Sequence, residues 1–262
     1  MKIIVCLKQV PSGAQVAIDP TTGSLLRTGV TSDINLEDKH AIEEALLLKE
    51  KHGGKVTAIS MGPPQAEESL REALAMSVDE AILLSDKAFA GADTAATSYV
   101  LGSAINKLGK FDLIVCGKET SDGNTGQVGP QLAEYLQLPQ VTYVRKVEIR
   151  GRTLRAERAL EDGYELLETK LPAVITVTRQ INVPRKATID TIMYACRQKE
   201  VIVWTSDDLN VDRSRIGLNG SLTKMVKAFM PEPRKRAGEI FEGSTREVVG
   251  MLLQRLEQRH LI

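Results

Sequence analysis

The chain is organised around residues 117–130, GKETSDGNTGQVGP. This stretch follows the short apolar run from Phe111 to Cys116, which predicts a buried parallel strand, and it leads into residues 131–136, whose spacing predicts a helix. Pro130 fits only the first turn of that helix, so the helix cannot begin much before Gly126. The stretch, called the main loop below, therefore joins the carboxyl end of a strand to the amino end of a helix.

Glycine recurs at every third position of the main loop, at Gly123, Gly126 and Gly129. This spacing leaves bare backbone in front of the unpaired N–H groups of a helix start, which is an arrangement suited to phosphate. Two other interpretations stay open: the glycines could serve close packing of the helix on the sheet, and Asp122 or Asn124 could cap the helix. Asp122 would repel a phosphate, so in a nucleotide site we expect it to meet a ribose hydroxyl or a backbone N–H.

The composition limits the classes of function that fit. The chain has 262 residues with 34 basic and 34 acidic side chains, a balance that argues against a general binder of nucleic acid or of membrane surfaces. Cysteines and histidines show no metal-ligand spacing, and Cys6 and Cys116 lie in apolar runs, where reduced core thiols are expected. No apolar run has membrane-spanning length and no signal-peptide pattern is found, so we expect a soluble, cytoplasmic protein. The basic run at 234–236 reads as a solvated or partner-facing segment.

Strand and helix patterns alternate through the first part of the chain. Strands are predicted at 2–7, 55–60, 80–84 and 111–116, and helices at 37–51, 65–76 and 94–108, the last capped by Asp93. This order predicts an α/β fold with a doubly wound, mostly parallel sheet, in which ligands bind at the carboxyl ends of the strands. Four segments should converge there with the main loop: 6–11, 35–38, 61–64 and 93–98. Because the chain has no GxGxxG, Walker A, GxSxG or HExxH motif, we expect a site that holds a ligand rather than one that cleaves it.

The second part of the chain changes period. Alternating residues at about 141–170 predict a β-meander of three short strands, followed by a buried strand at 171–177, a helix at 188–196 and a strand at 201–204. A turn at 19–23 predicts a small hairpin. Residues 207–243 show little periodicity and precede an amphipathic helix at 245–259. We therefore predict a nucleotide-binding domain over 1–206 and a C-terminal arm over 207–262 that packs on its own domain or on a partner chain.

Several motifs are jointly specific: VCLKQVP at 5–11, EEA at 43–45, SMGP at 60–63, EDGYE at 161–165, LPAVIT at 171–176, and INVPRKAT at 181–188 with Ile192-Met193. With them the chain resembles, nearly end to end, the beta subunit of electron-transfer flavoprotein. The resemblance implies a sheet that binds an adenine nucleotide, as in the related stress proteins, and a heterodimer with an alpha subunit that carries one FAD in a mobile domain. It also implies a second nucleotide in the beta subunit, which is AMP in the conventional branch. In the flavin-bifurcating branch that nucleotide is FAD, which takes hydride from NADH.

Two features favour the bifurcating branch. The main loop is shorter than the acidic insert associated with AMP binders, and residues 91–98 resemble the bifurcating type. There Thr94 and Thr97 share a helix face near its positive end, where they could form a second anion anchor suited to a pyrophosphate. In the alternative interpretation, Asp93 caps the helix and the threonines merely fill its first turn.

The resemblance then implies the function and the site. NADH would reduce the beta-site FAD; one electron would pass to ferredoxin, and the other through the alpha-subunit FAD to an acyl-CoA dehydrogenase-type client. No side chain need act as acid or base, since the flavin supplies the chemistry. We expect the cofactor site to comprise Cys6, Lys8, Asn35, Asp38, Met61, Asp93, Thr94, Thr97, Cys116, Gly117, Ser121, Asp122, Gly123, Asn124, Thr125, Gly126, Gln127, Val128 and Gly129.

The segment from Ile181 to Arg185 resembles the loop that engages client dehydrogenases. We expect Ile181 to be held out by the restricted backbone around Pro184, as an apolar anchor beside a guiding charge at Arg185. An ordinary turn between strand and helix is the alternative. Two other functions also stay open for the whole chain: a conventional carrier with structural AMP, and a stand-alone nucleotide-binding regulator or ATPase of the stress-protein type.

Overall fold

The computed structural model describes residues 1–11, 17–18, 25–26, 32–224, 226 and 238–262. The chain forms two compact units, Met1–Lys227 and Ala228–Ile262, which are described separately. The short strands β3 (Ala17–Ile18) and β4 (Leu25–Leu26) pair antiparallel, in agreement with the predicted hairpin. Its turn at 19–23 and the basic run at 234–236 lie outside the described residues.

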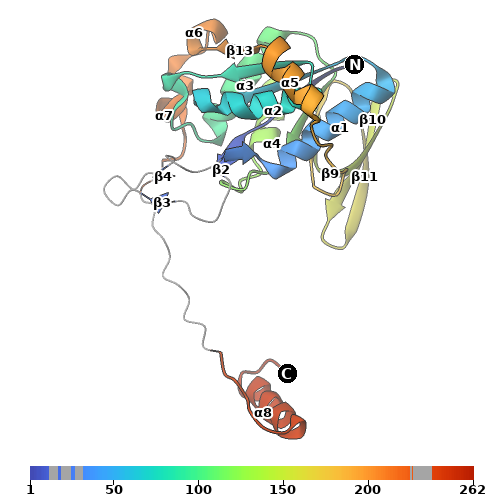
Figure 1. Ribbon diagram of the computed structural model, residues 1–262, viewed down its shortest axis with the longest axis vertical. Coiled ribbons are helices and arrows are strands. Elements are labelled where there is room, and N and C mark those ends of the chain that lie inside the picture. Colours follow the sequence, from blue (N-terminus) through green and yellow to red (C-terminus); the bar gives the residue numbers. More distant parts are fainter. Residues whose placement is uncertain (12–16, 19–24, 27–31, 225, 227–237) are drawn as a thin grey trace. The chain divides into compact units, whose positions relative to one another are not determined.

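In the described part of the first unit, a nine-stranded sheet has the order β11-β10-β9-β12-β8-β1-β6-β7-β13. All neighbours from β9 to β13 are parallel, whereas β9, β10 and β11 form an antiparallel meander (Figure 1). The strands span Lys2–Cys6 (β1), Lys55–Met61 (β6), Glu80–Leu84 (β7), Leu113–Gly117 (β8), Gln140–Arg150 (β9), Thr153–Leu160 (β10), Gly163–Lys170 (β11), Ala173–Val177 (β12) and Val201–Trp204 (β13). A two-stranded sheet pairs β2 (Gln9–Pro11) with β5 (Ser32–Ile34). The chain builds outward from β1 to one side and then returns through β8 to the other, so the switch in strand order lies between β1 and β8.

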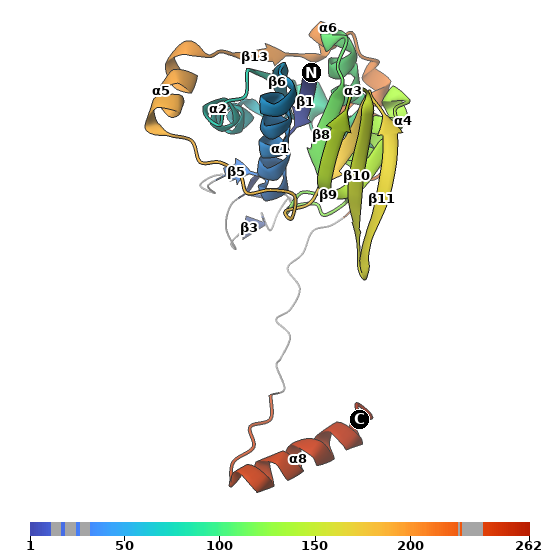
Figure 2. The same cartoon turned by 90° about the vertical axis from the view of Figure 1, so that its right-hand side faces the viewer.

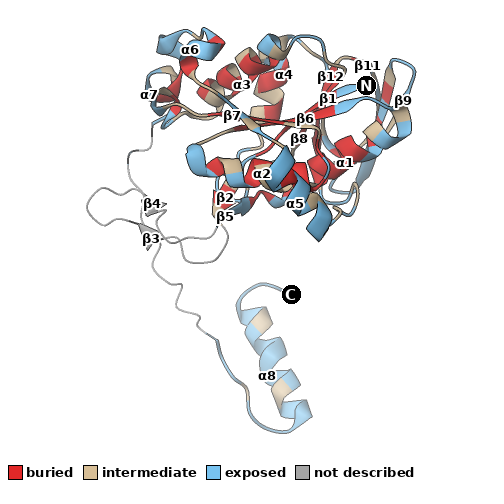
Figure 3. Ribbon diagram, turned by 45° about the horizontal axis from the view of Figure 1, so that its top comes forward, coloured by how far each residue is buried: buried red, intermediate tan, exposed pale blue. Residues whose placement is uncertain are grey.

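Helices cover both faces of the large sheet, as predicted. Figure 2 shows α1, α2 and α5 on one face and α3 and α4 on the other. Their bounds are Leu36–His52 (α1), Glu67–Ala75 (α2, after the 3₁₀ turn η1, Pro64–Ala66), Thr94–Leu108 (α3, after η2, Lys87–Phe89), Val128–Leu136 (α4) and Ile189–Gln198 (α5). Successive residues of β1 serve the two layers in turn: Ile3 and Val5 belong to the core under α1, and Ile4 and Cys6 to the core under α3. The central strands are therefore buried on both sides (Figure 3).

The first unit continues past residue 206, the boundary predicted from the sequence. Two short helices, α6 (Ser206–Leu209) and α7 (Gly217–Gly220), flank the 3₁₀ turn η3 (Arg213–Arg215). Leu209 and Ile216 are buried in the core under α3, and the Arg215 guanidinium lies 4.0 Å from the ring centroid of Tyr99 on α3. Non-local contacts therefore order this part of a segment whose sequence lacks periodicity.

The second unit holds α8 (Thr245–Gln258), close to the helix predicted at 245–259. A capping box begins it, since the side chain of Glu247 accepts hydrogen bonds from the backbone N–H and the hydroxyl of Ser244. Along the predicted apolar face Val248 and Leu256 are half-buried, whereas Val249, Leu252 and Leu253 are exposed.

Candidate functional site

The main loop occupies the switch point between β8 and α4, where the sequence placed it. The helix begins at Val128, so Pro130 lies in its first turn as predicted. Gln127 stands at the N-cap and makes no side-chain capping bond. The interpretation that Asp122 or Asn124 caps α4 is therefore wrong, and the first N–H groups of the helix have no side-chain acceptor at the cap.

The three glycines of the main loop serve two different purposes. A Cβ on Gly129 would overlap Cγ2 of Thr176, so this glycine allows α4 to pack closely on β12. Gly126 has φ +62°, a conformation that favours glycine, and a Cβ there would meet no atom closer than 3.5 Å. Gly123 is similarly open, with its nearest atom at 3.6 Å. Close packing on the sheet is thus confirmed for Gly129, whereas Gly123 and Gly126 leave open backbone where the phosphate site is predicted.

The amino end of α1 fastens the start of the main loop. Asn35 donates through Nδ2 to the Glu119 carbonyl at 2.8 Å and accepts from the Ser121 N–H at 3.2 Å. Glu37 accepts from the Glu119 N–H at 3.0 Å. Asp38 accepts from the N–H groups of Lys8 at 2.8 Å and Gly117 at 3.1 Å, and so ties the end of β1 to the end of β8. The geometry of Asn35 and Asp38 therefore fits residues that position the loop.

Burial sets the protonation of these carboxyl groups. Desolvation raises the pKa of Asp38 to about 7, although the N–H groups of Lys8 and Gly117 favour the ionised form. Desolvation also raises the pKa of Glu37, against the Glu119 N–H and the charges of Lys118 and Arg179. Both carboxyl groups are thus less readily ionised than exposed acids at the same pH.

Asp122 has a partner that the sequence did not predict. Its carboxylate forms an ion pair with the Lys8 ammonium at 2.5 Å, and its predicted contact with a ribose hydroxyl or a backbone N–H in a nucleotide site stays a prediction. Burial raises the pKa of Asp122, but the hydrogen bond and charge of Lys8 outweigh it and leave the pKa below its usual value. The pair neutralises the charge that would otherwise repel a phosphate from the main loop.

The start of α3 lies beside the start of α4. Asp93 caps α3, as predicted, by accepting from the N–H groups of Ala95 and Ala96, each at 3.0 Å. The Thr94 hydroxyl donates to Oε1 of Gln127 at 3.0 Å, which joins the two helix starts across 33 residues of chain. Thr97 is half-buried one turn further along α3. Two positive helix ends therefore meet next to the open glycines.

The remaining predicted site residues divide into a floor and an exposed rim. Cys6 and Cys116 lie directly opposite each other on β1 and β8, and both are free, buried thiols, as expected. Met61 packs against the same core. On the rim, the exposed loop residues are Ser121, Gly123, Asn124 and Thr125.

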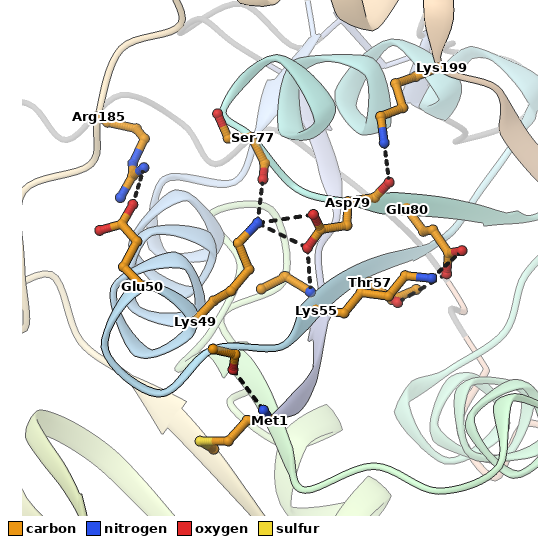
Figure 4. A network of polar contacts seen from close by, with 12 residues as sticks. Met1, Lys49, Glu50, Lys55, Thr57, Ser77, Asp79, Glu80, Arg185 and Lys199 are labelled. Atoms are coloured by element: carbon orange, nitrogen blue, oxygen red, sulfur yellow. Dashed lines mark hydrogen bonds and ion pairs between the residues drawn. The ribbon is translucent and has the colours of Figure 1, made fainter.

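The segment from Ile181 to Arg185 is held differently from what the sequence suggested. Ile181 is half-buried and packs against the core, so the expectation that it is held out as an anchor is wrong; Val183, 87% exposed, projects instead. Arg185 donates to Glu43 at 2.8 Å through Nε and to Glu50 at 2.7 Å through Nη1, the second of which Figure 4 shows. These bonds to Glu43 and Glu50 raise the pKa of Arg185 and engage its charge within the chain. Pro184 is half-buried.

Asn182 provides a second attachment of this segment to α1. Its Nδ2 donates at 3.0 Å both to the His40 carbonyl and to Oε2 of Glu44, and its Oδ1 lies 3.1 Å from Nδ1 of His40. Burial raises the pKa of Glu44, against the hydrogen bond from Asn182. Helix α1 therefore holds the main loop at its amino end and the segment 182–185 along its middle.

A cavity at this edge was not predicted from the sequence. This cavity, of about 670 Å³, lies beside the main loop, and its lining includes Lys118, Tyr143, Arg158 and Arg179. Tyr143 and Arg158 belong to the meander, where no site residue was predicted from the sequence. In the described part of the chain, no cluster of His, Cys, Asp or Glu could hold a metal ion, and no helix is long and apolar enough to cross a membrane.

The fold and this edge define a doubly wound α/β protein with a glycine-rich strand-to-helix loop at the switch point. The electron transfer flavoprotein domain model matches residues 22–209. The chain is 55% identical, over the whole of both chains, to electron transfer flavoprotein subunit beta of Thermoanaerobacterium thermosaccharolyticum. With the same full coverage it is 44% identical to caffeyl-CoA reductase-Etf complex subunit CarD of Acetobacterium woodii and 43% identical to acryloyl-CoA reductase electron transfer subunit gamma of Anaerotignum propionicum. The chain belongs to the electron transfer flavoprotein family, as a beta subunit.

Proposed function

We propose that this beta subunit binds FAD at the main loop and is part of a cytoplasmic, NADH-dependent, electron-bifurcating complex. The observation that carries the proposal is the meeting of two helix starts, joined by the bond from Thr94 to Gln127, beside the open backbone of Gly126. Two positive helix ends suit the two phosphates of a dinucleotide, whereas AMP needs only one. The relatives named as subunits of a caffeyl-CoA reductase-Etf complex and of acryloyl-CoA reductase support a link to a reductase that acts on an acyl-CoA.

The residues present fit such a group. The first N–H groups of α4 have no side-chain cap, and the Lys8–Asp122 pair removes the repulsive charge in front of them. The Thr97 hydroxyl adds a donor at the start of α3, and the Thr94 hydroxyl adds a second one when it exchanges its bond to Gln127 for a phosphate oxygen. The chemistry that FAD supplies is acceptance of a hydride from NADH and its delivery as single electrons, one to ferredoxin and one through the alpha-subunit FAD to an acyl-CoA dehydrogenase-type client. The chain's own residues hold and orient that group.

Two parts of the chain are assigned to partners in this proposal. The exposed apolar residues of α8 pack on the alpha subunit, which covers side chains that would otherwise remain in water. The segment from Ile181 to Arg185, held to α1 at Asn182 and Arg185, contacts the client dehydrogenase. Its rigid attachment supports this role, because a preorganised loop loses little freedom on binding.

Cofactor analysis tests the proposal. The chain is co-expressed with its alpha subunit, the heterodimer is denatured, and the released FAD and AMP are quantified. We expect two FAD per heterodimer; one FAD with one AMP would establish the conventional alternative. A stable monomer that hydrolyses ATP would instead support the stand-alone regulator.

A matched pair of glycine variants tests where the nucleotide binds. Gly126→Val should lower beta-site occupancy, because a branched side chain fills the open side of the main loop. Gly151→Val is the control, since Gly151 has a similar φ of +58° and open surroundings but lies at the turn between β9 and β10. Full nucleotide content in Gly126→Val, or equal loss in both variants, would reject the assignment of the main loop.

A further inference from the structure

A β-bulge re-aims Tyr143 out of the sheet. The register between β9 and β12 shifts, so that Val141 pairs with Ile175 while Val144 pairs with Val177. Two residues of β9 thus oppose Thr176 alone, and the bulge keeps both valines in the core. Tyr143 takes φ +56° at this point, and its N–H donates to the Thr176 hydroxyl at 3.1 Å.

This conformation is unusual for the residue that adopts it. A bulky side chain at positive φ is strained, and such strain persists only where surrounding contacts impose it, often at binding sites. The result here is an aromatic side chain that remains 39% exposed although it stands between two buried valines. The strained backbone of Tyr143 therefore does not serve to bury its ring.

Tyr143 faces the same edge as the main loop. A Cβ on Gly126 would lie 3.7 Å from the tyrosine hydroxyl, and the Lys118 ammonium lies 5.6 Å from the ring centroid. The ring also lines the cavity of about 670 Å³, together with Lys118 and Glu119 from the main loop and Arg179 after β12. This volume is in the range of pockets that bind whole organic ligands.

The strand order places this cavity to one side of the main loop. The Cys6–Cys116 floor lies between β1 and β8, whereas the cavity lies on the far side of β8, past the end of β12 and beside Tyr143 of β9 and the end of β10. A mononucleotide seated on the main loop and the floor would leave the cavity empty. A dinucleotide with its phosphates on the main loop has a second ring system to place on the other side.

We propose that Tyr143 is a ring-contacting residue for the isoalloxazine of the FAD whose phosphates the main loop holds. This inference rests on the proposed function, because it needs FAD in the beta subunit. Tyrosine suits the contact, since its flat ring offers an apolar face to a tricyclic system and its hydroxyl can stay in water. A tyrosine in contact with a flavin also quenches the flavin's fluorescence by donating an electron to the excited ring, which gives a direct readout.

The test compares Tyr143→Leu and Tyr143→Phe in the heterodimer with its alpha subunit, alongside Tyr164→Leu as a control. Tyr164 is an exposed tyrosine on β11 in the same meander, and Arg145 covers it at 4.1 Å from the ring centroid. FAD and AMP are quantified after denaturation, and the dissociation constant for FAD and the flavin fluorescence lifetime are measured on intact protein. The alpha-subunit flavin is common to all variants and cancels in the comparison.

We expect Tyr143→Leu to weaken FAD binding at least fivefold and to add a long-lived flavin emission. Tyr143→Phe should keep the affinity, because it keeps the ring, and should still gain emission, because phenylalanine is a poor electron donor. Tyr164→Leu should match the parent in both. A loss of FAD affinity in Tyr143→Leu but not in Tyr143→Phe indicates ring contact. A merely structural role of Tyr143 would change the FAD affinity of both variants or of neither.

Three results would overturn the inference. Two FAD per heterodimer with parental affinity and emission in Tyr143→Leu would reject it and leave the proposed function intact. A raised KM for NADH with unchanged emission would place the nicotinamide, not the flavin, against Tyr143. One FAD with one AMP in the parent would reject the proposed function and the inference together.

Discussion

Changing Glu43 to Gln tests how strongly α1 holds the segment 182–185. Glu43 is a buried carboxylate that accepts three hydrogen bonds from Arg185, at 3.0 Å from the backbone N–H, 2.8 Å from Nε and 3.0 Å from Nη2. Glutamine keeps one acceptor oxygen but turns an NH₂ group toward the remaining donors. The substitution therefore removes the charge and at least one bond while preserving the shape of the side chain.

The expected loss in the free energy of unfolding follows from the exposure of Glu43 and Arg185. Loss of one partner of a fully buried ion pair costs about 3–5 kcal/mol. The Arg185 side chain is 30% exposed and keeps its contact with Glu50, so we expect the lower figure of about 2–3 kcal/mol, also the range of one hydrogen bond to a charged group. Glu50→Gln is the matched control, because Glu50 is 53% exposed and its surface ion pair is worth less than about 1 kcal/mol.

Urea unfolding of the chain gives the free energy of unfolding for each variant, and hydrogen exchange reports the opening of residues 182–188. Glu43→Gln should lose the expected stability and exchange faster in that segment. If the segment contacts the client, the KM for the client should rise while NADH-dependent flavin reduction stays unchanged. A loss below about 0.5 kcal/mol, or an equal loss in Glu50→Gln, would refute the reasoning, since exposed pairs of that kind contribute so little.

Three further predictions concern the main loop and its supports. Gly129→Ala should destabilise the chain by about 1–3 kcal/mol, because its Cβ overlaps Cγ2 of Thr176, and Thr176→Ser should rescue it in urea unfolding by removing that methyl while keeping the hydroxyl. The folded chain raises the pKa of Asp38 from 3.8 to about 7, so this group's contribution to the free energy of unfolding should fall, by up to about 4 kcal/mol, as pH rises from about 4 to 7. In Asp38→Asn this decrease in the free energy of unfolding with pH should be absent. The prediction would be contradicted if the variant showed the same pH dependence as the parent. Thr94→Val with Thr97→Val should weaken FAD binding at least about tenfold, with a smaller effect on AMP, and full FAD occupancy with unaltered NADH reduction would remove this anchor.

The sequence predicted those elements whose signals are local. Strand β7 coincides with the apolar run Glu80–Leu84, and α3 begins one residue after its Asp93 cap. It did not predict long-range contacts. The ion pair of Lys8 with Asp122 joins residues 114 apart, and Ile181 is covered by a core assembled from other elements. Tyr143 lies in an unbroken β-pattern, and only the pairing of β9 with β12 creates the bulge that turns it outward. The loop and its neighbours Asn35 and Asp38 were therefore predictable, whereas the ion pair at Asp122 and the bulge at Tyr143 were not.

Packing of the C-terminal helix α8 on the alpha subunit, as proposed above, would set how the heat of assembly changes with temperature. It is 14 residues long, and along its apolar face only Val248 and Leu256 are even half-buried in its unit. A helix of this length outside a folded core is only marginally stable in water. Covering Val249, Leu252 and Leu253 with the alpha subunit would complete its folding and bury apolar surface in one step. Titration calorimetry of the two subunits at several temperatures should therefore give a more negative heat-capacity change for the whole chain than for a chain that ends before residue 238.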